Sequence, residues 1–277
     1  MSKPIQEQTI VITGGSLGIG AAAARALRKQ GATVVITGRS EETLRLAQEI
    51  GATGIQSDYK DLSSVRQLAQ QLLDNYPTID VLANNVGAIM NQRHLTQDGY
   101  EATFQVNHLG GFLLTALLQE RLNASKALVI NTSSIGNNMG QIKLEDLQNE
   151  QKYDALRAYG TAKLMNILHT NELQRRYGDA IKAVSFHPGP VATGFAREGS
   201  FWVKLAYETP LKHLFLISPE KGADTLLWLI NGEAGKDWHP GGYYSKRKPG
   251  RKHVQSNDPE LARLLWEASA HLLDLKT

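Results

Sequence analysis

The chain has 277 residues, a length that suits one large α/β domain or two small ones. Its hydrophobic fraction of 42% can form a sizeable core, and its charged fraction of 21% argues against disorder. The 30 Lys and Arg residues nearly balance the 27 Asp and Glu residues, so the composition gives no sign of nucleic-acid binding. The chain contains no cysteine, which excludes disulfides, thiolate chemistry and thiolate metal sites.

The N-terminal segment MSKPIQEQ is polar and lacks the apolar core of a signal peptide. No stretch approaches about 18 consecutive apolar residues, so no transmembrane anchor is expected. The eight histidines show no metal-ligand spacing, and we expect no metal site. We therefore expect a cytoplasmic protein.

Short apolar runs alternate with longer amphipathic stretches. Strands are predicted at residues 9–13, 32–37, 54–58, 79–85, 126–134 and 180–189. Helices are predicted at residues 21–30, 41–51, 62–75, 96–122 and 157–177. The alternation predicts an α/β fold, a Rossmann-type doubly wound parallel sheet of about seven strands with helices on both faces. Ligands of such sheets bind beyond the carboxyl ends of the strands.

No linker or internal repeat interrupts this pattern, so residues 1–277 are predicted to form a single domain. The stretch 190–217 is irregular and rich in aromatic residues, among them Phe195, Phe201, Trp202 and Tyr207. This stretch is predicted to be either a flap over the site or a plain surface connection with its own small core. On the first interpretation its aromatic side chains favour a lipophilic substrate.

The first predicted strand runs into the glycine-rich turn TGGSLGIG, residues 13–20. Glycines at such a turn tolerate positive φ and lack a Cβ, so the backbone can approach a phosphate. The N–H groups and partial positive charge of the following helix N-terminus favour the same ligand. Ordinary turn chemistry is the alternative, but the strand–turn–helix context favours dinucleotide binding. The residues predicted to hold the cofactor there are Gly14, Ser16, Leu17, Gly18, Ile19 and Gly20.

The second predicted strand ends in TGRS, residues 37–40, where dinucleotide folds often carry an acidic residue for the ribose 2′-hydroxyl. Arg39 can pair with a 2′-phosphate that a carboxylate would repel, so we favour NADP(H) over NAD(H). The alternative is that Arg39 is a solvated surface charge. Asp58 closes the third predicted strand, where it either contacts the adenine ring or serves as a turn or helix-cap residue.

The pattern Tyr-x-x-x-Lys occurs twice, at Tyr159–Lys163 and at Tyr244–Lys248. Four-residue spacing brings the two side chains together only on a helix. The first pair lies on a predicted helix, whereas Pro249 disfavours a helix at the second. We therefore predict that only the first pair is catalytic.

Several motifs occur in order: TGxxxGxG, NNxG, QVNHLG, two serines closing a strand, YxxxK and HPGPVAT. Together they resemble the short-chain dehydrogenase/reductase family over roughly residues 8–195, and RAYGTAKLMNIL and DPELARLLWEAS further resemble its retinol dehydrogenase-like branch. The resemblance implies hydride transfer that interconverts a carbonyl and an alcohol. It implies Tyr159 as general acid/base, supported by the nearby cation of Lys163, and Ser134 as hydrogen-bond donor to the substrate oxygen. It also implies that Asn107 bends its helix and holds a water in a proton relay to Lys163.

The resemblance implies further cofactor contacts from residues that share the strand ends and the catalytic helix: Asn85, Gly87, Tyr159, Lys163, Pro188, Gly189, Val191 and Thr193. The two neighbouring asparagines Asn84 and Asn85 are expected to bond nearby backbone. Relatives pair through helices equivalent to 96–122 and 157–177, which implies a homodimer or homotetramer. The branch usually carries a membrane anchor, and its absence here argues against retinol as substrate.

This sequence departs from the family pattern in several places, one of which is NNVG instead of the more usual NNAG. Leu17 stands where some NADP-dependent members carry a basic residue, so the cofactor preference depends on Arg39. Ser134 and Tyr159 are unusually far apart, and the insertion at 139–155 is predicted to border the substrate cleft. Two other functions are considered, a non-catalytic NADP(H)-sensing regulatory protein and a nucleic-acid or membrane-surface protein using the basic segment 245–253. A solvated loop is the simpler interpretation of that segment.

Overall fold

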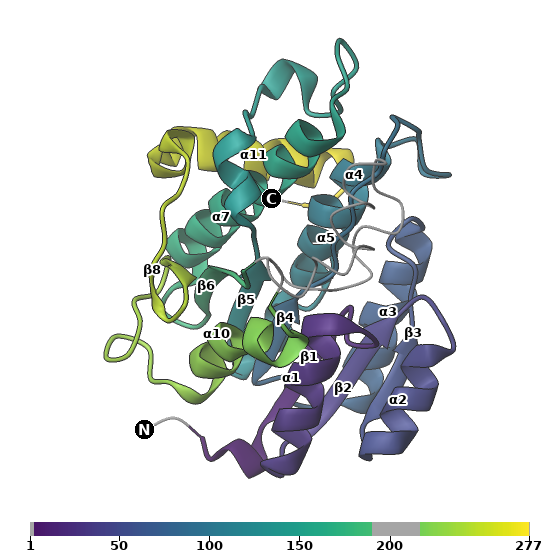
Figure 1. The fold of residues 1–277 in the computed structure, drawn as a ribbon, viewed down its shortest axis with the longest axis vertical. Coiled ribbons are helices and arrows are strands. Elements are labelled where there is room, and N and C mark those ends of the chain that lie inside the picture. The colour runs from purple at the N-terminus through teal and green to yellow at the C-terminus, as the bar shows by residue number, and fades with distance from the viewer. Residues whose placement is uncertain (1–2, 190–216, 277) are drawn as a thin grey trace.

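The computed structural model of the protein describes residues 3–189 and 217–276. Within them, one eight-stranded sheet has the order β3-β2-β1-β4-β5-β6-β7-β8 (Figure 1). The first seven strands are parallel, and β8 pairs antiparallel with β7 at the edge. The strands are β1 (Thr9–Thr13), β2 (Thr33–Gly38), β3 (Thr53–Gln56), β4 (Val81–Asn84), β5 (Leu128–Thr132), β6 (Lys182–His187), β7 (Tyr243–Ser245) and β8 (Lys248–Pro249).

Helices connect the parallel strands and cover both faces of the sheet. The α-helices are α1 (Gly18–Lys29), α2 (Glu42–Ile50), α3 (Leu62–Asn75), α4 (Ala102–Phe104), α5 (Gly110–Leu117), α6 (Gln119–Ala124), α7 (Ala155–Tyr177), α10 (Pro219–Asn231) and α11 (Pro259–Leu272). The shorter elements are the 3-10 helices η1 (Ile5–Glu7), η3 (Ile135–Met139), η4 (Leu144–Asp146) and η6 (Val254–Asn257), and the π-helix η2 (Gln105–Leu109).

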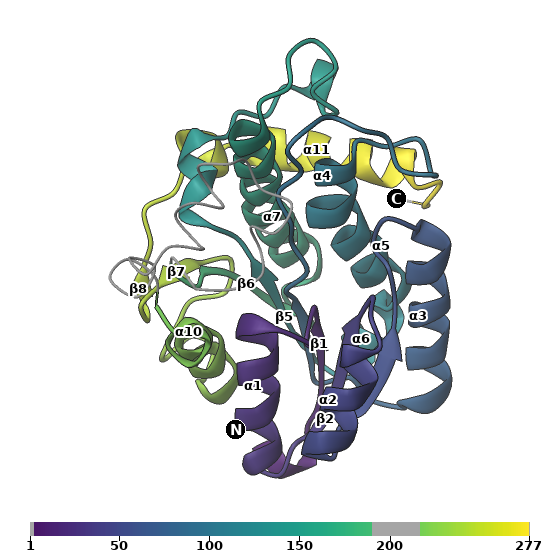
Figure 2. The ribbon, with the colours of Figure 1, turned by 45° about the vertical axis from the view of Figure 1, so that its right-hand side comes forward.

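The two faces of the sheet carry separate apolar cores because side chains alternate along each strand. On β1, Ile10 and Ile12 belong to the core under α1, α2 and α10, and Val11 belongs to the core under α3, α5 and α7. Figure 2 shows α1 and α10 together on one side of the sheet and α3 and α5 on the other. The doubly wound parallel sheet predicted from the sequence is therefore confirmed, with one more strand than expected.

The winding direction reverses between β1 and β4, which are neighbours in the sheet. From β1 the chain proceeds outward through β2 and β3, then returns to β4 and continues through β5 and β6 on the other side. A crevice for a ligand opens at such a reversal, beyond the carboxyl ends of the strands. The glycine-rich turn after β1 lies at this position.

The predicted helix at 96–122 begins later than expected, at Ala102. Residues before it form a turn in which Thr96 N–H donates to the Tyr100 carbonyl, and Gly99 adopts a φ of 82° that a helix does not allow. The Glu101 carboxylate then accepts hydrogen bonds from the first N–H groups of α4. The sequence DG at 98–99 was the turn signal that the helical prediction overlooked.

The C-terminal helix α11 packs on α7, and the stretch Ala158–Thr170 of α7 is completely buried within one chain. A helix that is buried on all sides needs small and polar residues where other backbones approach closely. This stretch therefore has no exposed face that a second subunit could contact. The expected homodimer or homotetramer is not tested by a single chain and remains a prediction.

Candidate active site

The turn after β1 has the backbone geometry expected of a phosphate cradle. Gly14 and Gly18 have φ values of 63° and 56°. A Cβ on Gly20 would lie 2.4 Å from the Gly14 carbonyl oxygen, so the turn folds back closely on the first turn of α1. In the described structure no side chain caps α1, whose N-terminus begins after Leu17. The first N–H groups of the helix thus face the crevice at the reversal point.

Ser16 lies beside the end of β2, where the sequence predicts the ribose of the cofactor. A Cβ added to Gly38 would be 2.9 Å from the Ser16 hydroxyl oxygen. Arg39 is exposed and follows directly after β2. The fold therefore brings Ser16 and Arg39, which are distant in sequence, to the same edge of the crevice.

Asn85 links three strand ends around the turn. Its side-chain N–H groups donate to the carbonyls of Thr13 (3.1 Å) and Gly14 (3.3 Å), and its Oδ1 accepts from the Thr132 hydroxyl. The expected bonding to nearby backbone is thus confirmed for Asn85. It is wrong for Asn84, whose amide donates to the side chains of Thr115 and Asn131 because it faces the buried α5 side of the sheet.

Lys163 lies at the centre of the site and is 1% exposed. Its Nζ donates to the Thr132 carbonyl at 3.3 Å and lies 5.6 Å from the centroid of the Tyr159 ring. Burial lowers the pKa of Lys163 to about 7, because the ammonium form loses its hydration. A Cβ on Gly87 would be 2.8 Å from Nζ, so a side chain at that position would require the lysine ammonium group to shift.

Tyr159 and Ser134 meet on either side of Gly136. A Cβ on Gly136 would lie 3.4 Å from both the Ser134 hydroxyl oxygen and Cε1 of the tyrosine ring. Ser134 follows β5, and its hydroxyl accepts a hydrogen bond from Gly136 N–H at 3.1 Å. That bond leaves the hydroxyl hydrogen available to donate elsewhere. The neighbouring Ser133 has a different role, since its hydroxyl donates to the Lys163 carbonyl at 2.7 Å and joins β5 to α7.

Glycines allow the loop after β5 to approach α7 closely enough to form this group. A Cβ on Gly160 would be 2.4 Å from the Gly136 carbonyl oxygen, and one on Gly140 would be 2.5 Å from the carbonyl carbon of Gly160. Tyr159 is only 8% exposed as a result. These three glycines position the site, although the sequence analysis did not single them out.

Asn107 occupies the middle of the π-helix η2, where the wider turn interrupts the regular helix. Its amide nitrogen donates to the carbonyls of Ala88 and Thr103, both at 2.8 Å, and its Oδ1 accepts from Ala88 N–H at 3.1 Å. These bonds hold the loop that follows β4. A Cβ on Gly87 would be 3.0 Å from Asn107 Oδ1, so Asn107 and Lys163 lie against the same glycine.

Other predicted site residues lie at the rim or outside the described structure. Pro188 and Gly189 follow β6, and Gly189 has a φ of 95°. Asp58 lies beyond β3, which ends at Gln56, and its Oδ1 accepts from Lys60 N–H, as in the predicted turn role. The predicted flap at 190–217, with Val191 and Thr193, falls outside the described residues except for its last residue.

The second Tyr-x-x-x-Lys copy lies on a hairpin, and the absence of a helix there agrees with the prediction from Pro249. Tyr244 belongs to β7 and Lys248 to β8, and Tyr244 pairs with Pro249 across the hairpin. The Tyr244 hydroxyl accepts a hydrogen bond from His239 N–H at 2.7 Å. No helical turn brings the Tyr244 and Lys248 side chains together.

The insertion at 139–155 packs on the chain that follows β4. The Tyr153 hydroxyl donates to the Met90 carbonyl at 2.8 Å, and Gln148 Oε1 accepts from Glu101 N–H at 3.0 Å. Arg93 Nε in turn donates to the Gln148 carbonyl at 3.2 Å. The insertion thus connects the loop after β5 with the entry into α4.

A doubly wound sheet with a glycine-rich turn at its reversal point is the architecture of dinucleotide-binding oxidoreductases. The family model described as short chain dehydrogenase matches residues 8–203. The chain therefore belongs to the short-chain dehydrogenase/reductase family and is an NAD(P)-dependent oxidoreductase.

Individual relatives support the same classification. The Streptomyces protein named "Putative daunorubicin C-13 ketoreductase DnrU" is 43% identical, with 95% of this chain and 91% of the relative covered. Human retinol dehydrogenase 11 is 36% identical, covering 97% of this chain and 86% of its own length. A solved structure of a Mycobacterium paratuberculosis protein has a TM-score of 0.79 at 31% identity, covering 98% of this chain and 94% of that one. None of the helices in residues 3–189 and 217–276 combines the length and apolar character needed to cross a membrane.

Proposed function

We propose that the protein is an NADP-dependent carbonyl reductase or alcohol dehydrogenase, with Tyr159 as the general acid/base. The observation that carries this proposal is the buried Nζ of Lys163, 5.6 Å from the centroid of the Tyr159 ring, with the Ser134 hydroxyl close to the same ring. The nicotinamide cofactor supplies or accepts the hydride. Relatives named for a ketoreductase and for retinol dehydrogenases support a carbonyl or alcohol substrate.

In the reducing direction, the substrate carbonyl carbon receives the hydride while its oxygen receives the Tyr159 phenol proton. A free phenol has a pKa of about 10, so the phenolate left behind needs stabilisation at neutral pH. The protonated form of Lys163 provides it at close range in a buried site, and a phenolate beside the lysine favours that form. The Ser134 hydroxyl donates to the developing negative oxygen, and the same groups run in reverse for alcohol oxidation.

The test uses purified protein, NADPH and a panel of ketones, aldehydes and quinones that includes daunorubicin and retinal. We expect Tyr159→Phe to lower kcat at least about 100-fold, because the phenol proton is lost. Tyr244→Phe is the matched control, since it makes the same change in the other Tyr-x-x-x-Lys copy. Undiminished turnover in Tyr159→Phe would refute the mechanism. Cofactor binding without turnover on the whole panel would instead favour the NADP(H)-sensing regulator.

The NADP preference is proposed from Arg39, which follows β2 beside Ser16 at the ribose edge of the crevice. A guanidinium group can form charge-assisted bonds with a 2′-phosphate, which NADH lacks. We expect Arg39→Ala to weaken NADPH binding about tenfold and to leave NADH binding unchanged. Arg45→Ala is the control, because Arg45 is an exposed arginine on α2 that pairs with Glu41. An equal loss for both cofactors would contradict the assignment.

A lipophilic substrate is proposed from three exposed apolar side chains near the catalytic group. Ile135 directly follows Ser134 and is 66% exposed, and Met139 ends the same short helix at 53% exposure. Leu156, 42% exposed, lies one helical turn before Tyr159 on α7. Exposed apolar groups beside a reacting group favour an apolar ligand. Replacing Met139 by Lys should raise KM for apolar ketones more than for small polar aldehydes.

A further inference from the structure

Asn166 lies outside the proposed catalytic set, but it donates hydrogen bonds to the Asn107 carbonyl and to the carbonyl that accepts from Lys163. It is one turn after Lys163 on α7 and is 6% exposed. Its Nδ2 donates to the Thr132 carbonyl at 3.1 Å and to the Asn107 carbonyl at 3.0 Å. The Thr132 carbonyl is the same group that accepts from Lys163 Nζ. One amide thus joins the end of β5 to the π-helix directly beneath the lysine.

The contacts of Asn166 fix the orientation of its amide. Two carbonyl oxygens can only accept, so the amide nitrogen faces them and Oδ1 faces away. Oδ1 lies 3.3 Å from Nδ1 of His108, a ring that is 1% exposed. Burial lowers the pKa of His108 to about 4, so the ring is neutral at neutral pH. A neutral ring that donates from Nδ1 must accept at Nε2, which lies 3.0 Å from the Ser269 hydroxyl.

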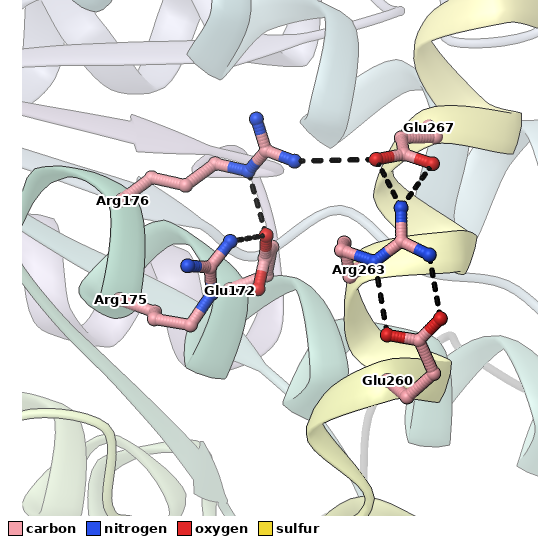
Figure 3. Close-up of polar contacts among 6 residues, drawn as sticks. All are labelled: Glu172, Arg175, Arg176, Glu260, Arg263 and Glu267. Carbon is pink, nitrogen blue, oxygen red and sulfur yellow. Dashed lines mark hydrogen bonds and ion pairs between the residues drawn. The ribbon is translucent and has the colours of Figure 1, made fainter.

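The network therefore begins on α11, and charged residues fasten this helix to α7. Figure 3 shows Arg176 of α7 between Glu172 on its own helix and Glu267 on α11. The Arg176 guanidinium also lies 5.1 Å from the ring centroid of Trp266. Figure 3 further shows Arg263 bridging Glu260 and Glu267 along α11. Ser269 is thus held on a helix that is well anchored to α7.

We infer that Asn166 is a positioning residue for the catalytic reaction, oriented by His108 and Ser269, and that it fixes the Thr132 carbonyl, which accepts from Lys163, relative to the Asn107 carbonyl of the π-helix. The inference builds on the proposed function, because it assigns the support of the proposed Lys163 cation. Asn166 acts through a hydrogen-bond acceptor that it shares with Lys163, the Thr132 carbonyl. If the amide is lost, the Thr132 and Asn107 carbonyls are free to shift, and the ammonium moves relative to the Tyr159 ring. Small displacements of a catalytic group can cost about 100-fold in rate.

The first test needs no substrate. Nuclear magnetic resonance of the full chain with labelled histidine and lysine should show His108 neutral and protonated on Nδ1 at neutral pH. His108→Gln and Lys163→Met assign the two signals. Asn166→Leu should shift the Lys163 Nζ signal, and Asn171→Leu should not. Asn171 is the matched control, since it lies on the same helix and donates to the Ser256 carbonyl at 2.8 Å, away from the site. A His108 ring protonated on Nε2 would overturn the inference, because the amide would then face the other way.

The second test measures turnover on a carbonyl that the wild-type enzyme reduces. Asn166→Leu should lower kcat about 10- to 100-fold with KM changed less than about threefold, and Asn171→Leu should match wild type. A kcat of Asn166→Leu within about twofold of wild type, at equal melting temperature, would overturn the inference. Absence of wild-type turnover on the whole panel would refute the proposed function instead, and the resonance experiment would still decide the role of Asn166.

Discussion

The buried ammonium of Lys163 should make the native protein less stable at neutral pH than the same fold with an apolar side chain there. Burial lowers the pKa of this lysine from 10.5 to about 7, so the folded protein releases a proton that the unfolded chain retains. Above pH 10.5 the lysine is neutral in both the folded and the unfolded state, so its burial carries no charge penalty and the folded protein has its full stability. That stability is lost progressively as the pH falls from 10.5 towards 7, because only the unfolded chain is then fully protonated.

The size of the effect follows from that difference in pKa. A pKa lowered from 10.5 to about 7 corresponds to roughly 5 kcal/mol of destabilisation once the lysine is protonated. The hydrogen bond to Thr132, which the neutral amine also donates and Met cannot, reduces the gain of the Met variant by about 1–2 kcal/mol. Lys163→Met should therefore unfold with a free energy about 3 kcal/mol higher than wild type near pH 6. The advantage should shrink by about 2 kcal/mol between pH 7 and 9.

The assay is urea unfolding of the cofactor-free protein, followed by tryptophan fluorescence at about pH 6, 7, 8 and 9. Lys29→Met is the control, because Lys29 is exposed on α1 and the same change removes an identical charge. The Lys163 variant should also be inactive, so stability and catalysis would change in opposite directions. A less stable Lys163→Met at pH 6, or a stability difference that does not change with pH, would refute the reasoning.

Three further substitutions test other parts of the site and its surroundings. Gly160→Ala places a Cβ 2.4 Å from the Gly136 carbonyl oxygen and should lower the unfolding free energy by about 1–3 kcal/mol. An unchanged urea midpoint would contradict the close approach of the loop after β5 to α7. Gly87→Ala places a Cβ 2.8 Å from Lys163 Nζ; it should lower kcat about tenfold, and steady-state kinetics equal to wild type would exclude this crowding. For Glu172, burial disfavours the charge but hydrogen bonds from two neighbouring arginines outweigh it and lower the pKa of the carboxyl. Glu172→Gln should thus lower the free energy of unfolding by about 1–2 kcal/mol at neutral pH. This loss should disappear in acid, where the wild-type carboxyl is protonated, and a loss that does not depend on pH would contradict the role of the ion pairs.

The sequence predicted the sheet well because the signal that marks its strands is local in the sequence. Apolar runs of four to six residues, such as β1 and β2, carry the information for strands buried on both faces. The turn at 96–101 was missed because its apolar neighbours continue a helical pattern, and only the dipeptide Asp98-Gly99 marks the interruption. The two-residue strand β8 is too short for any pattern to predict.

The candidate site was predictable only where a side-chain motif carries it. Tyr159 and Lys163 could be ranked above the second copy because they lie on a predicted helix, whereas Pro249 disfavours a helix at the second copy. The Thr132 carbonyl, which accepts from Lys163, has no such signal, since every residue has a carbonyl. The close approach at Gly160 also depends on residues distant in sequence, so it emerges only from the packed structure.

The attachment of α11 to α7 bears on how this enzyme can be divided. The family model ends at residue 203, and that segment contains all four proposed catalytic residues. Ser269, on α11, nevertheless reaches the site through His108 and Asn166. A chimera that takes its C-terminal segment from a relative would therefore have to exchange α7 and α11 as a matched pair. The segment that defines the family is shorter than the unit that should work as a catalyst.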